Sequence, residues 1–314
     1  MSFRLSAVLL LVLCLGCEGW QSVLVESEDF EPQLNVLAIL SPDEGGTVEI
    51  LVMRTLPLEG SSVEYGDPDT VCYYDEYYDT TFCYLERPWI SRIKVTDAEV
   101  TLSDGAVTYP FVYDSTQYAS NGFDVWSVNH AGRYSPVDIA FVPQAGVTYE
   151  LKVETPGGLQ VSGSCTIPPP VEIKVDQLSD TLQSGELFNV VWNPVTDYVR
   201  VKIESVEESL YWMQSCYVWE EAIVRHDSSW TFQIVPECWE WSDTLSPYEE
   251  VEIAVTAMDE RYYNYFYGSD IADYEEMSFF FLGEGDTGRS QGIEGGLGVF
   301  ASFRTSSVRR VIRL

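Results

Sequence analysis

Short runs of β-branched and aromatic residues recur along the sequence, and Gly, Pro, Asp or Ser bounds each run. Many such runs at regular spacing predict short strands and are typical of β-sandwiches and barrels. The predicted strands of the first half are 34–40, 47–53, 90–95, 98–102, 123–128, 137–142, 148–154 and 159–165. Those of the second half are 187–192, 198–205, 230–235, 251–258, 262–268, 277–282 and 299–303. An all-β fold is therefore expected, with a helical period only within 207–224.

Three consecutive prolines at 168–170 interrupt this pattern and predict a stiff, extended connector. We place a domain boundary there, between a β-sandwich of residues 33–168 and a second one of residues 169–314. The first is expected to be immunoglobulin-like or carboxypeptidase-regulatory-like. In the second, the order VVWNPV, YVRVKIES, VEIAVTAMD is typical of a fibronectin type III module, which predicts that Trp192 lies in the core.

The N-terminus is typical of a secretory signal. Arg4 precedes an apolar run at 7–15 that is too short to span a bilayer, and Gly16-Cys17 follows it. This dipeptide after the leucines is similar to a bacterial lipobox, in which the cysteine is acylated. We expect residues 1–16 to be a lipoprotein signal peptide, Cys17 to be lipidated and 17–32 to be an acidic tether. The alternative is an ordinary signal peptide that is cleaved nearby.

The charge balance narrows the classes of partner. The chain has 50 acidic and 17 basic residues, for a formal net charge of −33. Nucleic acid is excluded as a partner because phosphate binding needs a basic surface. An acidic surface keeps the chain soluble or suits cationic partners. Disorder is not expected, because 46% of the residues are hydrophobic.

The cysteines after Cys17 predict local disulfides, because an exported chain meets an oxidising compartment. Cys72 with Cys83 would close one loop, and Cys216 with Cys238 would link two aromatic segments. Cys165 is expected to be a buried strand cysteine.

Catalytic and cofactor motifs are missing from the sequence. Gly292, Gly295, Gly296 and Gly298 are followed by Val299 and Phe300 rather than by a Lys-Ser/Thr pair, so the segment fits no P-loop or dinucleotide fingerprint. These glycines predict positive φ or a bulge at the start of the last strand. The chain has two histidines and no nucleophile elbow or zinc motif. We therefore expect no catalytic residue, no cofactor and no enzyme.

An acidic and aromatic segment at 67–89 is the most distinctive candidate surface. Its tyrosines are candidate contacts to a protein partner or a glycan: Tyr73, Tyr74, Tyr77, Tyr78 and Tyr84. Its carboxylates are weaker candidates for a calcium site, with no EF-hand spacing: Asp67, Asp69, Asp75, Glu76 and Asp79. The alternative is a disulfide-linked hairpin whose tyrosines cover the sandwich.

A second aromatic segment at 259–276 carries Tyr262, Tyr263 and Tyr265, which form either a recognition surface or a small aromatic core. The basic tail at 304–314, with Arg304, Arg309, Arg310 and Arg313, is predicted to be either a final strand, whose arginines face acidic residues, or a disordered tail.

Several stretches together resemble domain-of-unknown-function family 4249. They are QLNVLAILSPDEGGTVEILVMRT, VTDAEVTLSDG, AGVTYELKVETPGGLQVSGSCTIPPPVEI and IEGGLGVFASF, together with the lipobox-like start. The resemblance implies a cell-envelope lipoprotein of the Bacteroidota type, built of β-sandwich domains and often encoded beside TonB-dependent outer-membrane receptors. It implies no catalytic residues.

The leading hypothesis is a non-enzymatic lipoprotein of the outer membrane, anchored through its lipid, that binds an outer-membrane receptor, its cargo or another envelope protein. The alternative is a carbohydrate-binding or carbohydrate-active surface protein that uses its aromatic loops.

Overall fold

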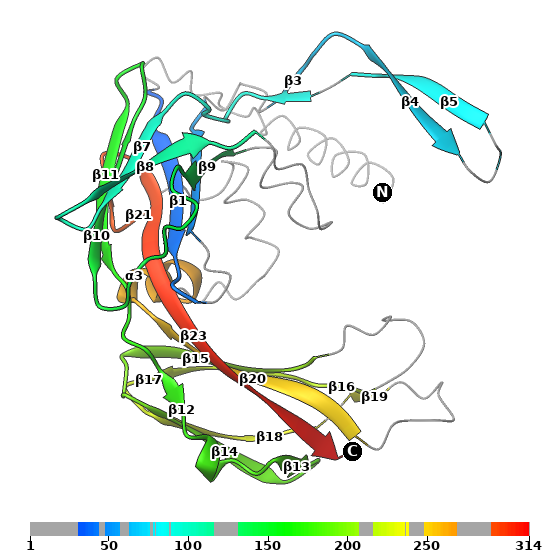
Figure 1. Ribbon diagram of the computed structural model, residues 1–314, viewed down its shortest axis with the longest axis vertical. Helices are drawn as coiled ribbons and strands as arrows, with labels where there is room; N and C mark the ends of the chain where they lie inside the picture. Colours follow the sequence, from blue (N-terminus) through cyan, green and yellow to red (C-terminus); the bar gives the residue numbers. More distant parts are fainter. Residues whose placement is uncertain are drawn as a thin grey trace, which may run out of the picture. The chain divides into compact units, whose positions relative to one another are not determined.

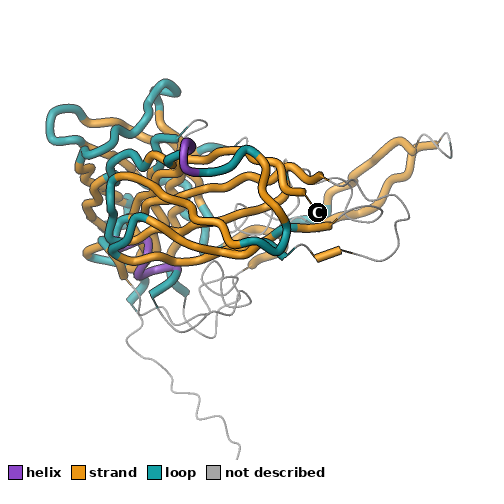
Figure 2. Tube along the Cα trace, turned by 90° about the horizontal axis from the view of Figure 1, so that it is seen from below, coloured by secondary structure: helices purple, strands orange, loops and turns teal. Residues whose placement is uncertain are grey.

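The computed structural model describes residues 31–43, 48–56, 63–75, 78, 80–87, 89–115, 131–206, 216–235, 237–238, 248–268 and 290–313. Strands make up most of this part of the chain, and the helical segments are the short helix α3 (Glu260–Phe266) and a 3-10 turn at Val175–Gln177 (Figure 2). Neither helical segment has the length and apolar character needed to cross a membrane. The all-β prediction is confirmed.

One curled sheet runs through the first half of the chain, in the strand order β23-β1-β2-β9-β8-β7-β10-β11-β22 (Figure 1). The bounds are β1 Leu34–Leu40, β2 Val48–Arg54, β7 Glu99–Ser103, β8 Thr108–Tyr113, β9 Gly132–Pro136, β10 Thr148–Glu154, β11 Gln160–Thr166, β21 Ser290–Gln291, β22 Ile293–Glu294 and β23 Leu297–Arg313. β21 pairs with β23 beside this path, and all neighbours along the path are antiparallel except β1 and β23.

The inner face of this sheet encloses the first apolar core. In β10, buried Tyr149, Leu151 and Val153 alternate with exposed polar residues, as expected of a strand with one face on the core. The same core contains Phe300 of β23, and Cys165 of β11 is 1% exposed, which confirms the expected buried cysteine. Burial raises the pKa of that thiol. The strands form one continuous path here rather than two separate sheets.

The second half packs two sheets against each other. The strands β12 Glu172–Ile173, β14 Leu187–Asn193 and β18 Ser229–Gln233 form a three-stranded sheet. The facing strands extend the curled sheet beyond β23. They are β17 Trp219–Arg225, β15 Tyr198–Ser205, β20 Tyr248–Met258 and the end of β23. Trp192 of β14 is 1% exposed in the second apolar core, with Val201 and Ile253 from the facing sheet. The prediction that Trp192 is a core residue is confirmed.

The remaining strands are short and pair locally, apart from one that extends the edge of β23. They are β3 Val63–Tyr65 with β6 Trp89–Ser91, β4 Asp69–Asp75 with β5 Thr80–Glu86, β16 Cys216–Tyr217 with β19 Glu237–Cys238, and β13 Thr181–Gln183 with the end of β23.

The last strand, β23, belongs to both halves. Leu297–Ser302 pairs in parallel with β1, and Phe303–Arg313 pairs antiparallel with β20 on the opposite edge. Its side chains enter both cores, through Phe300 in the first and Ile312 in the second. Residues Pro32–Leu314 accordingly form one compact unit. The basic tail forms the end of β23, which confirms the prediction of a final strand rather than a disordered tail. Its Arg309 is the register partner of Glu252 in β20.

Two aspartates hold β23 at the point where its partner changes. Asp259, just after β20, accepts hydrogen bonds from Ser302 N at 2.9 Å and Tyr262 N at 2.7 Å. Ser302 Oγ lies 3.0 Å from both the Asp259 carboxylate and the carbonyl oxygen of Thr166. On the other edge, Asp43, just after β1, accepts from Thr305 N. Burial raises the pKa of the Asp259 carboxyl, against the hydrogen bonds that lower it.

The prediction of a strand at 262–268 is wrong, because Glu260–Phe266 forms the helix α3. Asp259 accepts from Tyr262 N and so caps the helix N-terminus, which outweighs the strand propensity of the tyrosines. Tyr262, Tyr265 and Phe266 follow a helical spacing and pack against the apolar cluster that contains Leu37 and Val299, on the outer face of the curled sheet.

Two further predictions need correction. The segment 137–142 is a turn in which Asp138 Oδ1 accepts from Ala140 N, and the strand lies earlier, at β9. The helix predicted within 207–224 is wrong at Trp219–Arg225, because these residues form the strand β17 and pair with β15 along their whole length. Residues 207–215, 123–128 and 277–282 lie outside the described residues.

Three of the four glycines around the start of β23 have the positive φ that the sequence predicts, and Gly296 does not. Gly292, Gly295 and Gly298 have φ of 72°, 82° and 110°. At Gly298 a Cβ atom would lie 2.1 Å from the carbonyl oxygen of Val36. This glycine therefore meets two requirements at once, positive φ and a close approach to β1.

We expect Gly298→Ala to lower the free energy of unfolding by roughly 3 kcal/mol or more, since strain and a backbone clash add. Gly105→Ala is the matched control, because Gly105 has φ of 85° but nothing within 4 Å of an added Cβ. It should lose only about 1 kcal/mol. Urea unfolding of both variants measures this, and equal losses would contradict the role given to the approach of β1.

We expect Asp259→Ala to lower the free energy of unfolding by about 2–4 kcal/mol, because the cap is lost and the Ser302 and Tyr262 N–H groups lose their acceptor. Glu260→Ala, at the exposed neighbouring position, should change it by about 0.5 kcal/mol or less. Chemical denaturation of the two variants tests this, and similar small effects would argue against a structural role for the Asp259 network.

Candidate functional site

The hairpin of β4 and β5 carries several large exposed apolar side chains, namely Tyr73, Tyr74, Tyr78, Phe82, Tyr84 and Leu85. Its strands form a two-stranded sheet in which Cys72 faces Cys83 and Tyr73 faces Phe82. No described residue of the hairpin belongs to the apolar cores, and the described side chains are exposed except for half-buried Val71. The hairpin therefore needs a source of stability other than burial.

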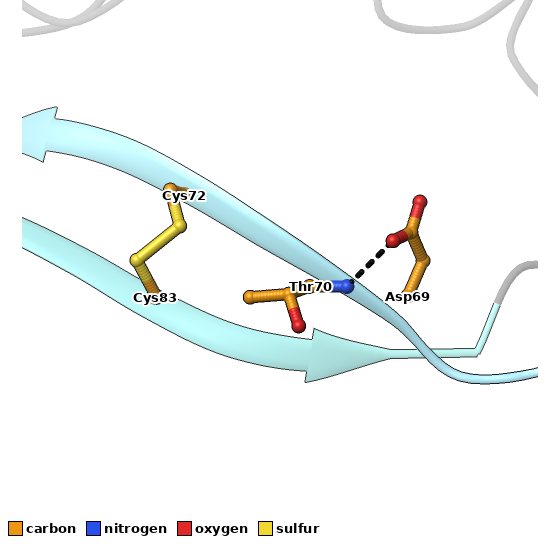
Figure 3. Close-up of a disulfide and its surroundings, with 4 residues drawn as sticks. All are labelled: Asp69, Thr70, Cys72 and Cys83. Atoms are coloured by element: carbon orange, nitrogen blue, oxygen red, sulfur yellow. Dashed lines mark hydrogen bonds between the residues drawn. A yellow bond between two sulfur atoms is a disulfide. The ribbon is translucent and has the colours of Figure 1, made fainter.

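That source is a disulfide between Cys72 and Cys83, whose Cα atoms are 4.1 Å apart (Figure 3). A two-stranded hairpin alone is marginal in water, and a cross-link over 11 residues removes about 3 kcal/mol of chain entropy from the open state. Asp69 Oδ1 also accepts from Thr70 N at 2.8 Å near the base of the hairpin. The predicted Cys72–Cys83 disulfide is confirmed.

The predicted pair Cys216 and Cys238 has compatible backbone positions. The two residues are register partners in the short ladder of β16 and β19. Their side chains lie outside the described part of the structure, so this disulfide stays a prediction.

One face of the hairpin carries a row of aromatic rings. We call Val71, Tyr73, Tyr78, Phe82 and Tyr84 the hairpin aromatic face. The ring centroids of Tyr73 and Phe82 are 5.8 Å apart, those of Tyr73 and Tyr84 are 6.3 Å apart, and those of Tyr78 and Phe82 are 6.2 Å apart. The rings support one another while 41–66% of each residue stays exposed to solvent. Such a set of exposed rings is typical of a contact surface.

Of the other tyrosines predicted to make contacts, Tyr74 is also exposed, whereas those of α3 are packed. Tyr263 is 5% exposed, stacks on Tyr198 at 4.3 Å and lies beneath the Arg225 guanidinium at 4.5 Å. Tyr262 and Tyr265 pack against the outer face of the curled sheet, and burial raises the pKa of Tyr262 to about 12. Tyr77 lies outside the described residues.

The carboxylates predicted as calcium ligands are only partly described. Asp67 and Asp69 are exposed, Glu76 and Asp79 lie outside the described residues, and so does the side chain of Asp75. Within the described part of the chain, no group of three His, Cys, Asp or Glu residues is placed to hold a metal ion.

Phe82 and Val71 are the members of the hairpin aromatic face that the sequence analysis missed. The disulfide itself contained the signal: a pair between Cys72 and Cys83 places residue 73 opposite residue 82 in an antiparallel register. Asp259 and Asp43 were missed as well, because nothing local marks an aspartate that accepts from a distant strand.

The curled sheet, the two cores and the disulfide-linked hairpin define an all-β protein with an exposed aromatic surface. The family described as domain of unknown function (DUF4249) matches residues 21–309. The chain belongs to this family, as the sequence resemblance predicted. Comparisons with curated proteins and with solved structures found no match.

We expect the double change Cys72→Ser and Cys83→Ser to open the hairpin locally, because no described residue of the hairpin belongs to an apolar core that would replace the cross-link. Amide hydrogen exchange within 70–84 should become about tenfold faster or more. The global free energy of unfolding should fall by no more than about 1 kcal/mol. A loss of several kcal/mol in global stability would show instead that the hairpin is part of the cooperative core.

Proposed function

We propose that this protein is a non-enzymatic binding module that contacts a macromolecular partner through the hairpin aromatic face. One observation carries the proposal: apolar rings stay exposed on a hairpin that is stabilised by a disulfide instead of by a core. A hairpin that served only to cover the sheet would bury these rings. A rigid hairpin with exposed rings loses little conformational entropy when a partner covers it.

We further propose that the protein is a cell-envelope lipoprotein, anchored to the outer membrane through acylated Cys17 after removal of residues 1–16. The signal-like N-terminus and the acidic tether at 17–32 support this. The partner is then an outer-membrane receptor of the TonB-dependent type, its cargo or another envelope protein.

We also propose that each half of the chain is a β-sandwich of a particular type. In the second half, a three-stranded sheet (β12, β14, β18) faces β17, β15, β20 and β23 across a core with buried Trp192, which supports a fibronectin type III-like sandwich. In the first half, β11 contacts both β1 and β23 although it is far from them in the strand order. That contact supports a flattened, immunoglobulin-like or carboxypeptidase-regulatory-like sandwich.

The binding role predicts that contact with a partner depends on the hairpin. We expect cross-linking of the tagged full-length protein in its native membranes to give a discrete product. The double change Tyr73→Ser and Tyr84→Ser should lower its yield by about tenfold, as loss of central aromatic contacts does at protein interfaces. Ile139→Ser is the control, because Ile139 is 95% exposed on a turn outside the hairpin. A product of equal yield from all three proteins would refute the binding role of the hairpin.

A further inference from the structure

We propose that the hairpin aromatic face binds a Lys- or Arg-rich polypeptide segment of the partner, which its rings hold by cation–π contacts. This inference rests on the binding role proposed above and specifies its chemistry.

The segment that forms the hairpin is strongly acidic. Between residues 67 and 87 the sequence contains six acidic residues, Asp67, Asp69, Asp75, Glu76, Asp79 and Glu86, and one basic residue, Arg87. Asp69 lies at the base of the hairpin on the same face as Tyr73, since the two are separated by four positions along β4. The whole chain carries a formal charge of −33. The potential around the hairpin therefore favours approach by a cation.

The rings are oriented to receive cations rather than a flat ligand. The ring planes of Tyr73 and Phe82 differ by 30°, those of Tyr73 and Tyr84 by 67°, and those of Tyr78 and Phe82 by 87°. A row of sugar rings needs near-coplanar platforms, and these rings do not provide one. Tilted rings present several electron-rich faces, and each of them can accept an ammonium or guanidinium group.

The same chain already uses this contact elsewhere. Lys202 Nζ lies 4.3 Å from the ring centroid of Trp219, and Lys94 Nζ lies 5.3 Å from that of Tyr113. Those cations come from the protein itself. On the hairpin, Tyr73, Phe82 and Tyr84 are 41–51% exposed, so cations of a partner can reach their faces.

The rigidity of the hairpin favours an extended segment. β4 runs for 7 residues, which corresponds to roughly 20 Å of strand. An extended peptide of similar length can place alternate side chains on the rings. Because the disulfide fixes the two strands, binding orders the peptide and leaves the hairpin unchanged.

The test uses the full-length protein and a labelled peptide in which arginine alternates with serine, followed by fluorescence anisotropy. The neutral comparison is the same peptide with citrulline in place of arginine. We expect the arginine peptide to bind about tenfold more tightly or better than the citrulline peptide, with weaker binding as salt rises from about 50 to about 300 mM.

Variants separate the rings from general charge attraction. Tyr73→Leu with Tyr84→Leu keeps the net charge and the apolar character of the face. We expect this variant to weaken binding of the arginine peptide about fivefold or more, whereas Tyr73→Phe with Tyr84→Phe should keep that binding. Ile139→Ser should leave binding unchanged. Equal binding by the Leu and Phe variants would overturn the proposal, because attraction to the acidic surface alone would then account for the affinity.

Two other outcomes would also overturn the inference and still leave the binding role intact. One is that the arginine and citrulline peptides bind equally well and that Tyr73→Leu with Tyr84→Leu weakens the binding of both. The other is that the arginine peptide does not bind, whereas a soluble linear oligosaccharide binds and the Leu variant weakens its binding. That result would make the face a glycan site. The binding role itself is tested separately by the cross-linking experiment, and it fails if the yield of the product does not depend on the hairpin.

Discussion

The backbone pairing of β23 is the interaction on which the rest of this structure depends. One strand of 17 residues completes the curled sheet of the first half through β1 and the facing sheet of the second half through β20. Its partners lie on opposite edges, so each edge of β23 loses its neighbour near residues 302–305. Asp259 on one edge and Asp43 on the other accept the N–H groups that would otherwise be unpaired there. Gly298 lets the strand approach β1 closely enough to pair.

The hairpin follows a different principle. None of its described residues belongs to the apolar cores and a covalent link joins its strands, so its exposed rings can be covered or changed at little cost to the fold. Separating the stable scaffold from the contact surface is common in proteins that bind through loops on a rigid framework. We propose that the curled sheet plays the part of the framework and the hairpin that of the contact surface.

The amount that the sequence revealed differs from one feature to another, for physical reasons. Period-2 alternation is local, so strands such as β10 and β15 could be predicted within a residue or two. The disulfide of the hairpin and the positive φ of the glycines were likewise local signals. Helix α3 was missed because one side-chain cap at Asp259 decided between strand and helix. The shared pairing of β23 was beyond prediction, since both of its partners lie far away in the sequence.

The aromatic segments show the same limit. Tyr73 and Tyr263 occur in similar acidic and aromatic stretches, yet the first is 51% exposed and the second 5%. Composition alone cannot separate them, because the difference arises from whether the segment packs against the sheet. Only the fold shows that the hairpin carries exposed rings and that α3 uses its rings as core.

Native-state hydrogen exchange along β23 tests the central claim most directly. If β23 joins the two cores into one cooperative unit, the amides of Val299 and Ala301 and those of Val308 and Ile312 exchange through the same global opening. Their opening free energies then agree within about 0.5 kcal/mol and respond equally to denaturant. Opening of residues 308–312 at a free energy several kcal/mol lower than that of 299–301 would contradict the account, because the two halves would then unfold independently.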